Sequence, residues 1–242
     1  VCGSTGKNNK ERIIEATSIL GDSYSFGMSV QSMDDKVLDN IKRSNIKLDH
    51  FTAINDHLKK IGKDTLTELI IGLPGETKES FTNGLRDLID AETDRLTIYT
   101  LMMLYGTEFK DQKYREKFDM KGKYRIVPLN LGKYDGVKIF DYEEVCVENR
   151  DMSFKDYLDI RQFALIIETV FNNQPFEVFF RYAITEGISR YDFLLQTLNN
   201  IHKAPKKIID FFNDFKRESK EELWNSDVEM IKYYQKDEHY QR

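Results

Sequence analysis

The chain has very little cysteine and histidine, and each scarcity argues against a class of function. Its 242 residues include two cysteines, one near the start and one past the middle, so neither a zinc motif nor a disulfide framework is indicated. Its four histidines are scattered, without the i, i+4 spacing of paired metal ligands. No apolar run approaches the roughly 18 residues of a membrane span, and no phosphate-binding loop motif is present. Few cysteines and no signal peptide are typical of a reducing cytoplasm, where we expect the protein.

The charge balance is mixed and slightly acidic. The sequence has 36 basic and 41 acidic residues, which gives a formal net charge of -5 at pH 7. Nucleic-acid binding normally needs a basic face, so this composition gives no evidence of such a partner. Hydrophobic residues make up 40% of the chain, enough for a core in one domain or one and a half.

The first half of the chain predicts parallel strands that alternate with helices. Apolar strand patterns cover residues 25–30, 66–72 and 96–104, and helical patterns begin near Asn8, Asp34, Asp49 and Thr77. Alternation of this kind indicates βα units, either part of a barrel or part of an open sheet. In both folds ligands bind beyond the carboxyl ends of the strands. The opening residues 1–6 are expected to form a loop, which would leave strand 25–30 at an unpaired edge that invites association.

The second half has a different character. Short strands are predicted at 124–127 and 137–147, with Asp135 and Gly136 forming a turn. Ser153 and Asp156 form a capping box for a long helix, and Pro205 begins a later helix. We therefore predict an α/β fold with two parts: residues 1–120 as a half βα barrel, and residues 121–242 as small strands followed by a mostly helical region.

The most informative segment runs from Thr67 to Thr77, where an apolar strand enters a Gly-Leu-Pro-Gly turn and a helix then begins. Glu68 and Ile70 lie two residues apart and share one face of the strand. An inward carboxylate beside an apolar side chain suits a nucleoside, because the acid accepts from ribose hydroxyls while the apolar group packs on the base. The alternative is that Glu68 is solvated and Ile70 belongs to the core. Glu76 is expected in the first helical turn, where acids are favoured.

Three further positions have two interpretations each. Gln31 with Ser32 ends an apolar strand, so the pair either binds a ligand or caps the helix that begins near Asp34. Arg43 ends that helix, where a cation complements the macrodipole, but it can also bind a carboxylate. Met102 lies in a nearly apolar strand, so it belongs to the core or lines a flat aromatic ligand.

Three segments together resemble the second half of a radical SAM domain. They are Ser-Val-Gln-Ser at 29–32 with Lys42 and Arg43, the segment Glu-Leu-Ile-Ile-Gly-Leu-Pro-Gly-Glu-Thr at 68–77, and residues 101–108 with Tyr-Gly-Thr. They occur in the family's order and spacing, and they cover about residues 10–120. The helical part that follows is similar, more weakly, to cobalamin-binding radical SAM proteins.

The resemblance implies cofactors and roles for the matched positions. Gln31 would reach the SAM ribose, Arg43 would pair with the methionyl carboxylate, and Glu68 would bind the ribose hydroxyls. Ile70 would pack on the adenine, with the region of Met102 completing its pocket. The resemblance assigns no catalytic residue, substrate or reaction.

The family's Cys-x3-Cys-x2-Cys motif, which holds a 4Fe–4S cluster, is absent from this chain. We therefore expect the carboxyl-terminal portion of a radical SAM enzyme, with the cluster, and a cobalamin domain if there is one, in a missing N-terminal part or a completing chain. The two alternatives are a non-catalytic partner or binding protein derived from a half-barrel, and an unrelated βα-barrel enzyme.

Overall fold

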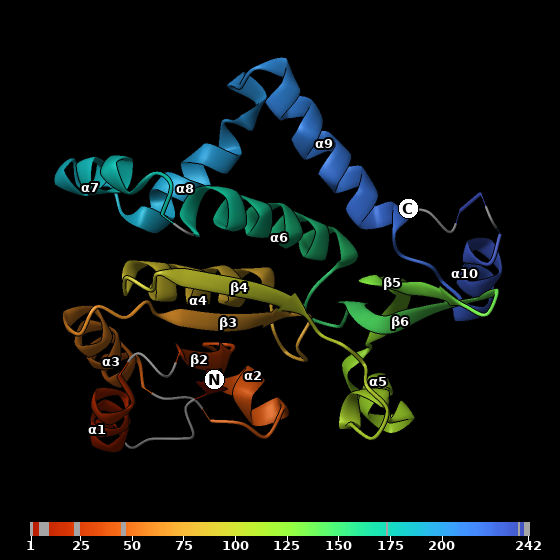
Figure 1. Ribbon diagram of the computed structural model, residues 1–242, viewed down its shortest axis with the longest axis horizontal. Coiled ribbons are helices and arrows are strands. Elements are labelled where there is room, and N and C mark those ends of the chain that lie inside the picture. The colour runs from red at the N-terminus through yellow and green to blue at the C-terminus, as the bar shows by residue number, and fades with distance from the viewer. Residues whose placement is uncertain are drawn as a thin grey trace.

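The computed structural model describes residues 2–4, 10–21, 25–44, 47–172, 174–236 and 238–239. It is an α/β fold with one parallel sheet, helices and an antiparallel hairpin (Figure 1). The sheet has the order β1-β2-β3-β4, with all neighbours parallel. Its strands and the helices between them are β1 (Cys2–Ser4), α1 (Lys10–Leu20), β2 (Ser25–Gln31), α2 (Asp35–Asn40), α3 (Leu48–Lys60), β3 (Leu66–Ile71), α4 (Lys78–Asp90) and β4 (Arg95–Thr100).

The later part begins with two short helical segments and the hairpin, and the rest is mostly helical. These elements are η2 (Glu108–Lys110), α5 (Gln112–Phe118), β5 (Lys121–Tyr134), β6 (Val137–Glu148), α6 (Phe154–Ile166), which continues as the π-helix η3 (Ile167–Phe171), α7 (Glu177–Thr185), α8 (Arg190–Asn199), η4 (Ile201–Lys203), α9 (Lys206–Glu221) and α10 (Asp227–Tyr234). None of the described helices is both long and apolar enough to cross a membrane.

The predicted alternation of strands and helices is confirmed, with two corrections at the sheet. Residues 2–4 form β1 and pair with the start of β2, so the expected loop and the expected unpaired edge of β2 are both wrong. A three-residue strand is too short to show a period of two in the sequence. The third predicted strand, 96–104, ends early because β4 stops at Thr100. The Leu101 carbonyl then accepts from the Cys146 N–H, so the chain continues beside β6. The predicted cap near Asn8 lies outside the described residues.

Local chemistry explains where the helices begin. Thr77 caps α4 in a reciprocal capping box with Ser80, and Ser153 does the same for α6 with Asp156. Asp34 accepts from two backbone amides at the start of α2. The hairpin turns at Asp135 and Gly136, both with positive φ (48° and 82°), as a tight hairpin turn requires.

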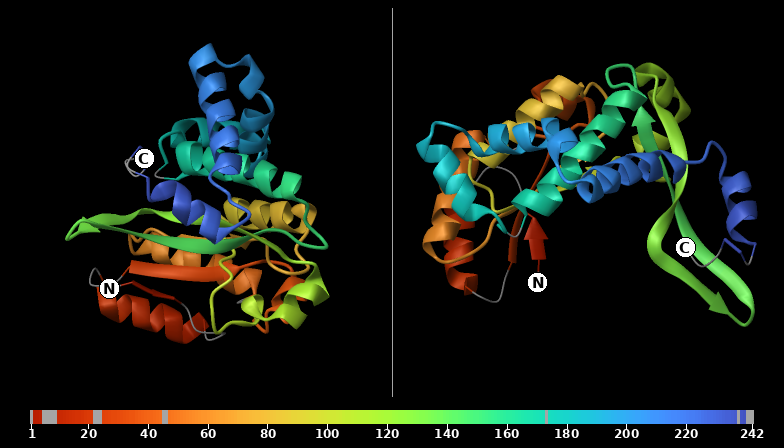
Figure 2. Two further views of the ribbon diagram at one scale, coloured as in Figure 1. Left: turned by 90° about the vertical axis from the view of Figure 1, so that its right-hand side faces the viewer. Right: turned by 90° about the horizontal axis from the view of Figure 1, so that it is seen from above.

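The two faces of the sheet differ in burial. Alternate residues of β2, β3 and β4, such as Val30, Leu69, Ile71 and Leu96, join a core with α3, α4, α6 and α8. In Figure 1, α6 and α8 lie above α4, while α3 lies beside α1 at the lower left, and Figure 2 gives two further views of this arrangement. The opposite residues of β3 and β4 are less covered, and Tyr99 is 49% exposed. The sheet therefore has one packed face and one open face.

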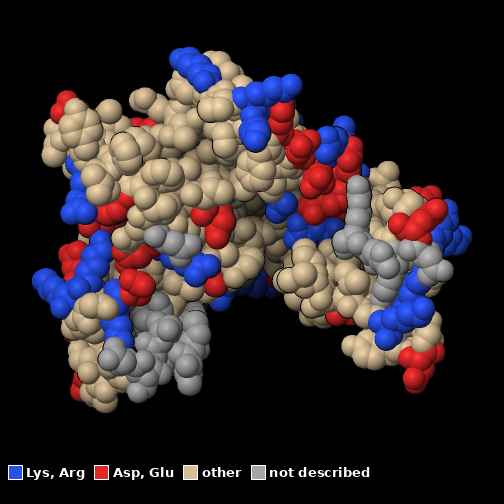
Figure 3. All heavy atoms as spheres, turned by 45° about the horizontal axis from the view of Figure 1, so that its top comes forward, with Lys and Arg blue, Asp and Glu red and all other residues tan. Residues whose placement is uncertain are grey.

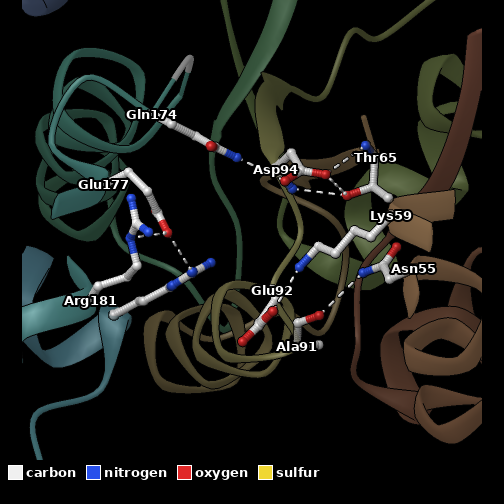
Figure 4. A network of polar contacts seen from close by, with 10 residues as sticks. Asn55, Lys59, Thr65, Ala91, Glu92, Asp94, Gln174, Glu177 and Arg181 are labelled. Carbon is white, nitrogen blue, oxygen red and sulfur yellow. Dashed lines mark hydrogen bonds and ion pairs between the residues drawn. The ribbon is translucent and has the colours of Figure 1, made fainter. Parts of the chain in front are cut away.

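A polar network fixes the amino ends of β3 and β4 (Figure 4). The Asp94 carboxylate accepts from the backbone N–H and the hydroxyl of Thr65, and Gln174 donates to its other oxygen at 2.8 Å. Nearby, Lys59 pairs with Glu92 at 2.7 Å. The charges here satisfy one another and backbone groups, which indicates a structural role for this end of the sheet.

The hairpin extends away from the helix-covered body and α10 lies against it (Figure 1). In the space-filling view, a notch separates the body from the hairpin and α10, and charges of both signs are interspersed (Figure 3). At its base the hairpin joins the sheet region, because the Met103 N–H donates to the Glu144 carbonyl at 2.8 Å.

Substitution of Gly72 tests how tightly this base packs. An alanine Cβ at Gly72 (φ 92°) would lie 2.8 Å from the backbone oxygen of Cys146, whereas at Gly106 (φ 83°) it would meet nothing within 4 Å. Gly106→Ala should cost about 1–2 kcal/mol of backbone strain. Gly72→Ala should cost about 1–3 kcal/mol more, because backbone must move. Urea denaturation of both variants measures the difference, and equal losses would contradict close packing at Gly72.

Candidate functional site

The Gly-Leu-Pro-Gly turn at residues 72–75 is held on two sides by asparagine side chains. The Asn149 amide donates to the carbonyls of Gly72 (3.3 Å) and Leu73 (3.1 Å). The Asn40 amide donates to the carbonyl of Pro74 at 3.0 Å. Gly72 and Gly75 both have φ near +90°, a conformation that favours glycine. The turn at the carboxyl end of β3 is thus fixed by hydrogen bonds from two asparagine amides to three of its backbone carbonyls.

Glu68 lies on the open face of β3, half-buried, and is hydrogen-bonded by the Ser29 hydroxyl from β2. On the other side, Tyr99 of β4 is close enough for Glu68 to affect its ionisation. Partial burial first, and then the Glu68 charge, raise the pKa of the Tyr99 phenol. Glu68 is therefore a half-buried carboxyl group flanked by two hydroxyl groups.

Ile70 lies two residues beyond Glu68 on the same face and is half-buried. It packs against a second apolar cluster at the carboxyl end of the sheet, made by Val37, Leu73, Leu101, Met103, Phe118, Met120 and Cys146. Its register partner on β4 is Tyr99. The open face thus places a carboxylate next to an apolar and aromatic surface.

Gln31 is the last residue of β2 and has a positive φ of 65°. A register shift between Ser29 and Gln31 places Gln31 beside Leu69, between Glu68 and Ile70 in the sequence of β3. Ser32 is buried, and its hydroxyl accepts from the Asp34 N–H at 3.1 Å. The cap of α2 is Asp34, and Ser32 bonds only the N–H of that cap residue, so the capping interpretation of Ser32 is wrong. Gln31 is half-buried at the strand end.

Arg43 and Met102 lie on segments beyond the strands. The prediction that Arg43 ends its helix is wrong, because α2 ends at Asn40 and the backbone turns through Lys42 (φ 55°). Arg43 is exposed, and its N–H donates to the Leu38 carbonyl at 2.8 Å. Met102 follows β4 and forms an isolated bridge with Val145. At 43% exposed, Met102 is not a core residue, unlike its neighbours Leu101 and Met103.

The position and the burial of Glu76 were not predicted from the sequence. It precedes the cap Thr77 rather than lying in the first turn of α4, and it is 1% exposed. Ser80 donates to one carboxylate oxygen at 2.7 Å, and the other has no hydrogen-bond partner in the described part of the chain. Burial raises the pKa of Glu76 to about 7, opposed by hydrogen bonds from Ser32 and Ser80. Ser32 and Glu76 thus join the ends of β2 and β3, a pairing between distant residues that no local pattern reveals.

The described residues do not fit an iron–sulfur cluster. They contain no group of three or more His, Cys, Asp or Glu side chains that could hold a metal ion. Cys146 is fully buried, and burial raises the pKa of its thiol to about 12, which disfavours the thiolate that metals need. They do present groups suited to a nucleoside: a flanked carboxylate, an adjacent apolar surface and a fixed turn.

Comparison with known proteins gives relatives for part of the chain. No protein-family model matches it. Over 129 residues, 52% of the chain, it is 30% identical to the cobalamin-dependent radical SAM methyltransferase TokK of Streptomyces tokunonensis. Over 88 residues, 35% of the chain, it is 34% identical to 2-(S-pantetheinyl)-carbapenam-3-carboxylate methyltransferase of Streptantibioticus cattleyicolor. It is also 30% identical, over 43% of the chain, to an uncharacterized protein of Methanocaldococcus jannaschii.

The matches span only a small part of those relatives: 18%, 13% and 30% of their lengths, respectively. Among solved structures, the radical SAM enzyme coproporphyrinogen III oxidase (HemN) of Escherichia coli is similar over 42% of this chain and 24% of its own. Its identity of 22% and TM-score of 0.36 are too low to place any residue. The predicted resemblance to radical SAM proteins is confirmed by the sequence relatives: the chain has homologues among cobalamin-dependent radical SAM methyltransferases.

Replacing Glu76 with glutamine should change how stability depends on pH. With its pKa raised from 4.5 to about 7, the Glu76 carboxyl favours the folded state fully below pH 4.5, and this contribution is lost as pH rises towards 7. The free energy of unfolding of the wild type should fall by on the order of 3 kcal/mol over this range. Glutamine does not titrate, so this pH dependence should be absent in Glu76→Gln. Urea denaturation from pH 4 to 8 measures the effect. Glu79→Gln, at an exposed acid in the first turn of α4, controls for loss of one negative charge. Parallel curves for wild type and Glu76→Gln would refute the assignment.

Proposed function

We propose that this chain is the carboxyl-terminal portion of a radical SAM enzyme and that its open sheet face binds SAM in the intact protein. The single observation that best supports this is the position of Glu68. It is a carboxylate on the open face, hydrogen-bonded by Ser29, two residues before Ile70 on the strand that leads into the fixed turn at residues 72–75. The sequence relatives support the family, and the site supports the assignment of the binding face.

The roles of the remaining residues follow from where they lie. Glu68 accepts hydrogen bonds from vicinal ribose hydroxyls, and Gln31 approaches the ribose from the end of β2. Ile70 packs on the adenine, with the exposed Met102 completing that surface. Arg43 is exposed beyond α2 and binds the carboxylate of the methionyl group. These assignments rest on the matched motifs and on the placement of each residue.

The overall architecture fits a half-barrel in which residues 1–120 supply parallel strands and residues 121–242 form a second part. The open face of β3 and β4 is the surface that further strands would enclose, supplied by a missing N-terminal part or a completing chain. Its apolar groups include Tyr99 and Met102, 49% and 43% exposed, which such strands would cover. The division near residue 120 falls where α5 ends and β5 begins.

The cofactors beyond SAM belong to the intact protein. A 4Fe–4S cluster, when bound, supplies the electron that cleaves SAM, and its cysteine ligands would lie outside the described residues. Cobalamin is proposed from the relatives, which include cobalamin-dependent methyltransferases. We place the protein in the cytoplasm, where a reducing environment keeps cluster thiolates intact. The substrate and the reaction are left open.

Replacement of Glu68 tests the proposal. In the reconstituted full-length protein, Glu68→Gln keeps the size of the side chain but removes the charge, so SAM affinity should fall by roughly tenfold or more. Isothermal titration calorimetry with SAM measures it. Glu92→Gln is the matched control, because Glu92 is an exposed acid at the amino end of the sheet. Unchanged affinity in Glu68→Gln, or an equal loss in both variants, would overturn the proposed binding face.

A further inference from the structure

Asn149 is a buried residue of the second part of the chain whose side chain contacts the turn of the first part. It is 5% exposed and lies just past the end of β6. Its amide donates to the carbonyls of Gly72 and Leu73, and its oxygen accepts from the backbone N–H groups of Asp151 (2.9 Å) and Met152 (3.0 Å). Both ends of the side chain are thus used, and its orientation is fixed.

The backbone before Asn149 also packs against the same turn. The Cys146 carbonyl lies so close to Gly72 that it would be only 2.8 Å from an added Cβ. The Cys146 N–H bonds to the Leu101 carbonyl at 2.9 Å, and Val145 bridges Met102. The segment from 144 to 149 therefore contacts both the turn after β3 and the residues that follow β4. These two segments follow the carboxyl ends of β3 and β4, the strands that form the open face.

We propose that Asn149 is a positioning residue for SAM binding, which acts by holding the carbonyls of Gly72 and Leu73 and so fixing the turn that follows Glu68 and Ile70 at the end of β3. The role rests on the proposed function. It means that the second part of the chain shapes the cofactor pocket in addition to covering the sheet. At metal sites, hydrogen bonds that orient the ligating groups contribute roughly 10–100-fold to affinity or activity, and we expect an effect at the lower end of that range here.

The structure supplies a matched control for a purely structural role. Asn172 is 1% exposed and also joins the second part to the sheet, because its amide exchanges hydrogen bonds with both backbone groups of Leu96 (2.9 and 3.0 Å). It acts at the amino end of β4, away from the turn. Loss of either asparagine leaves buried backbone groups unpaired, so both should destabilise the fold, by about 1–3 kcal/mol.

The experiment compares Asn149→Ala with Asn172→Ala in the reconstituted full-length protein. Calorimetry with SAM should show roughly tenfold weaker affinity for Asn149→Ala and unchanged affinity for Asn172→Ala, although both melt earlier. The rise in melting temperature on adding SAM should shrink only in Asn149→Ala, because that rise depends on affinity. If Asn149→Ala does not fold, Asn149→Asp replaces it in the same experiment. It keeps the acceptor for Asp151 and Met152 but removes both donations to the turn.

The outcomes distinguish the proposed role of Asn149 from the proposed binding of SAM on which it rests. If Glu68→Gln weakens SAM binding while the Asn149 variants do not, Asn149 is structural only and the inference is overturned. Equal losses of affinity in the Asn149 and Asn172 variants would overturn it as well. If Glu68→Gln leaves SAM binding unchanged, the proposed function fails, and the role of Asn149 fails with it.

Discussion

The backbone turn at residues 72–75 is the constraint on which the carboxyl end of this sheet depends. A parallel strand that ends without partners leaves carbonyl groups unpaired, and burying them without hydrogen bonds costs free energy. Here Asn40 and Asn149 satisfy three consecutive carbonyls, those of Gly72, Leu73 and Pro74, from opposite directions in the chain. The positive φ values at both glycines orient those carbonyls toward the two amides. The end of β3, the end of α2 at Asn40 and the segment after β6 at Asn149 thus all meet at the turn 72–75.

The acidic side chains at the two ends of the sheet differ in their hydrogen-bond partners. At the amino end, Asp94 accepts hydrogen bonds from Thr65 and Gln174, so both carboxylate oxygens have fixed neutral donors. Glu76, past the carboxyl end of β3, is a buried acid without a cation bonded to it in the described residues. Glu68, the third residue of β3, faces the open side and is bonded by a neutral hydroxyl. Glu76 therefore lies at the end of the sheet where parallel βα folds bind ligands.

Sequence reasoning predicted the elements well where a local signal exists. The helix start at Thr77, the capping box of Ser153 with Asp156 and the Asp135–Gly136 turn all have short-range signals, so these features were predicted correctly. The shared face of Glu68 and Ile70 follows from the period of a strand. Three of the failures share one cause. β1, the early end of β4 and the burial of Glu76 all depend on partners distant in the chain. The placement of Asn149 is of the same kind, since nothing near it in the sequence distinguishes it from an ordinary loop asparagine.

The contact between Asn149 and Gly72 spans 77 positions along the chain, and this has a consequence for how the protein is made. During synthesis the turn leaves the ribosome well before the residue that holds its carbonyls. At the usual pace of about 5–20 residues per second, several seconds separate the two. Over that interval β3 and α4 can assemble locally, while the turn between them stays conformationally unsettled. The turn is therefore fixed late, by the arrival of the hairpin and Asn149, and a ribosome-bound chain that ends before the hairpin has the sheet without these hydrogen bonds to its turn.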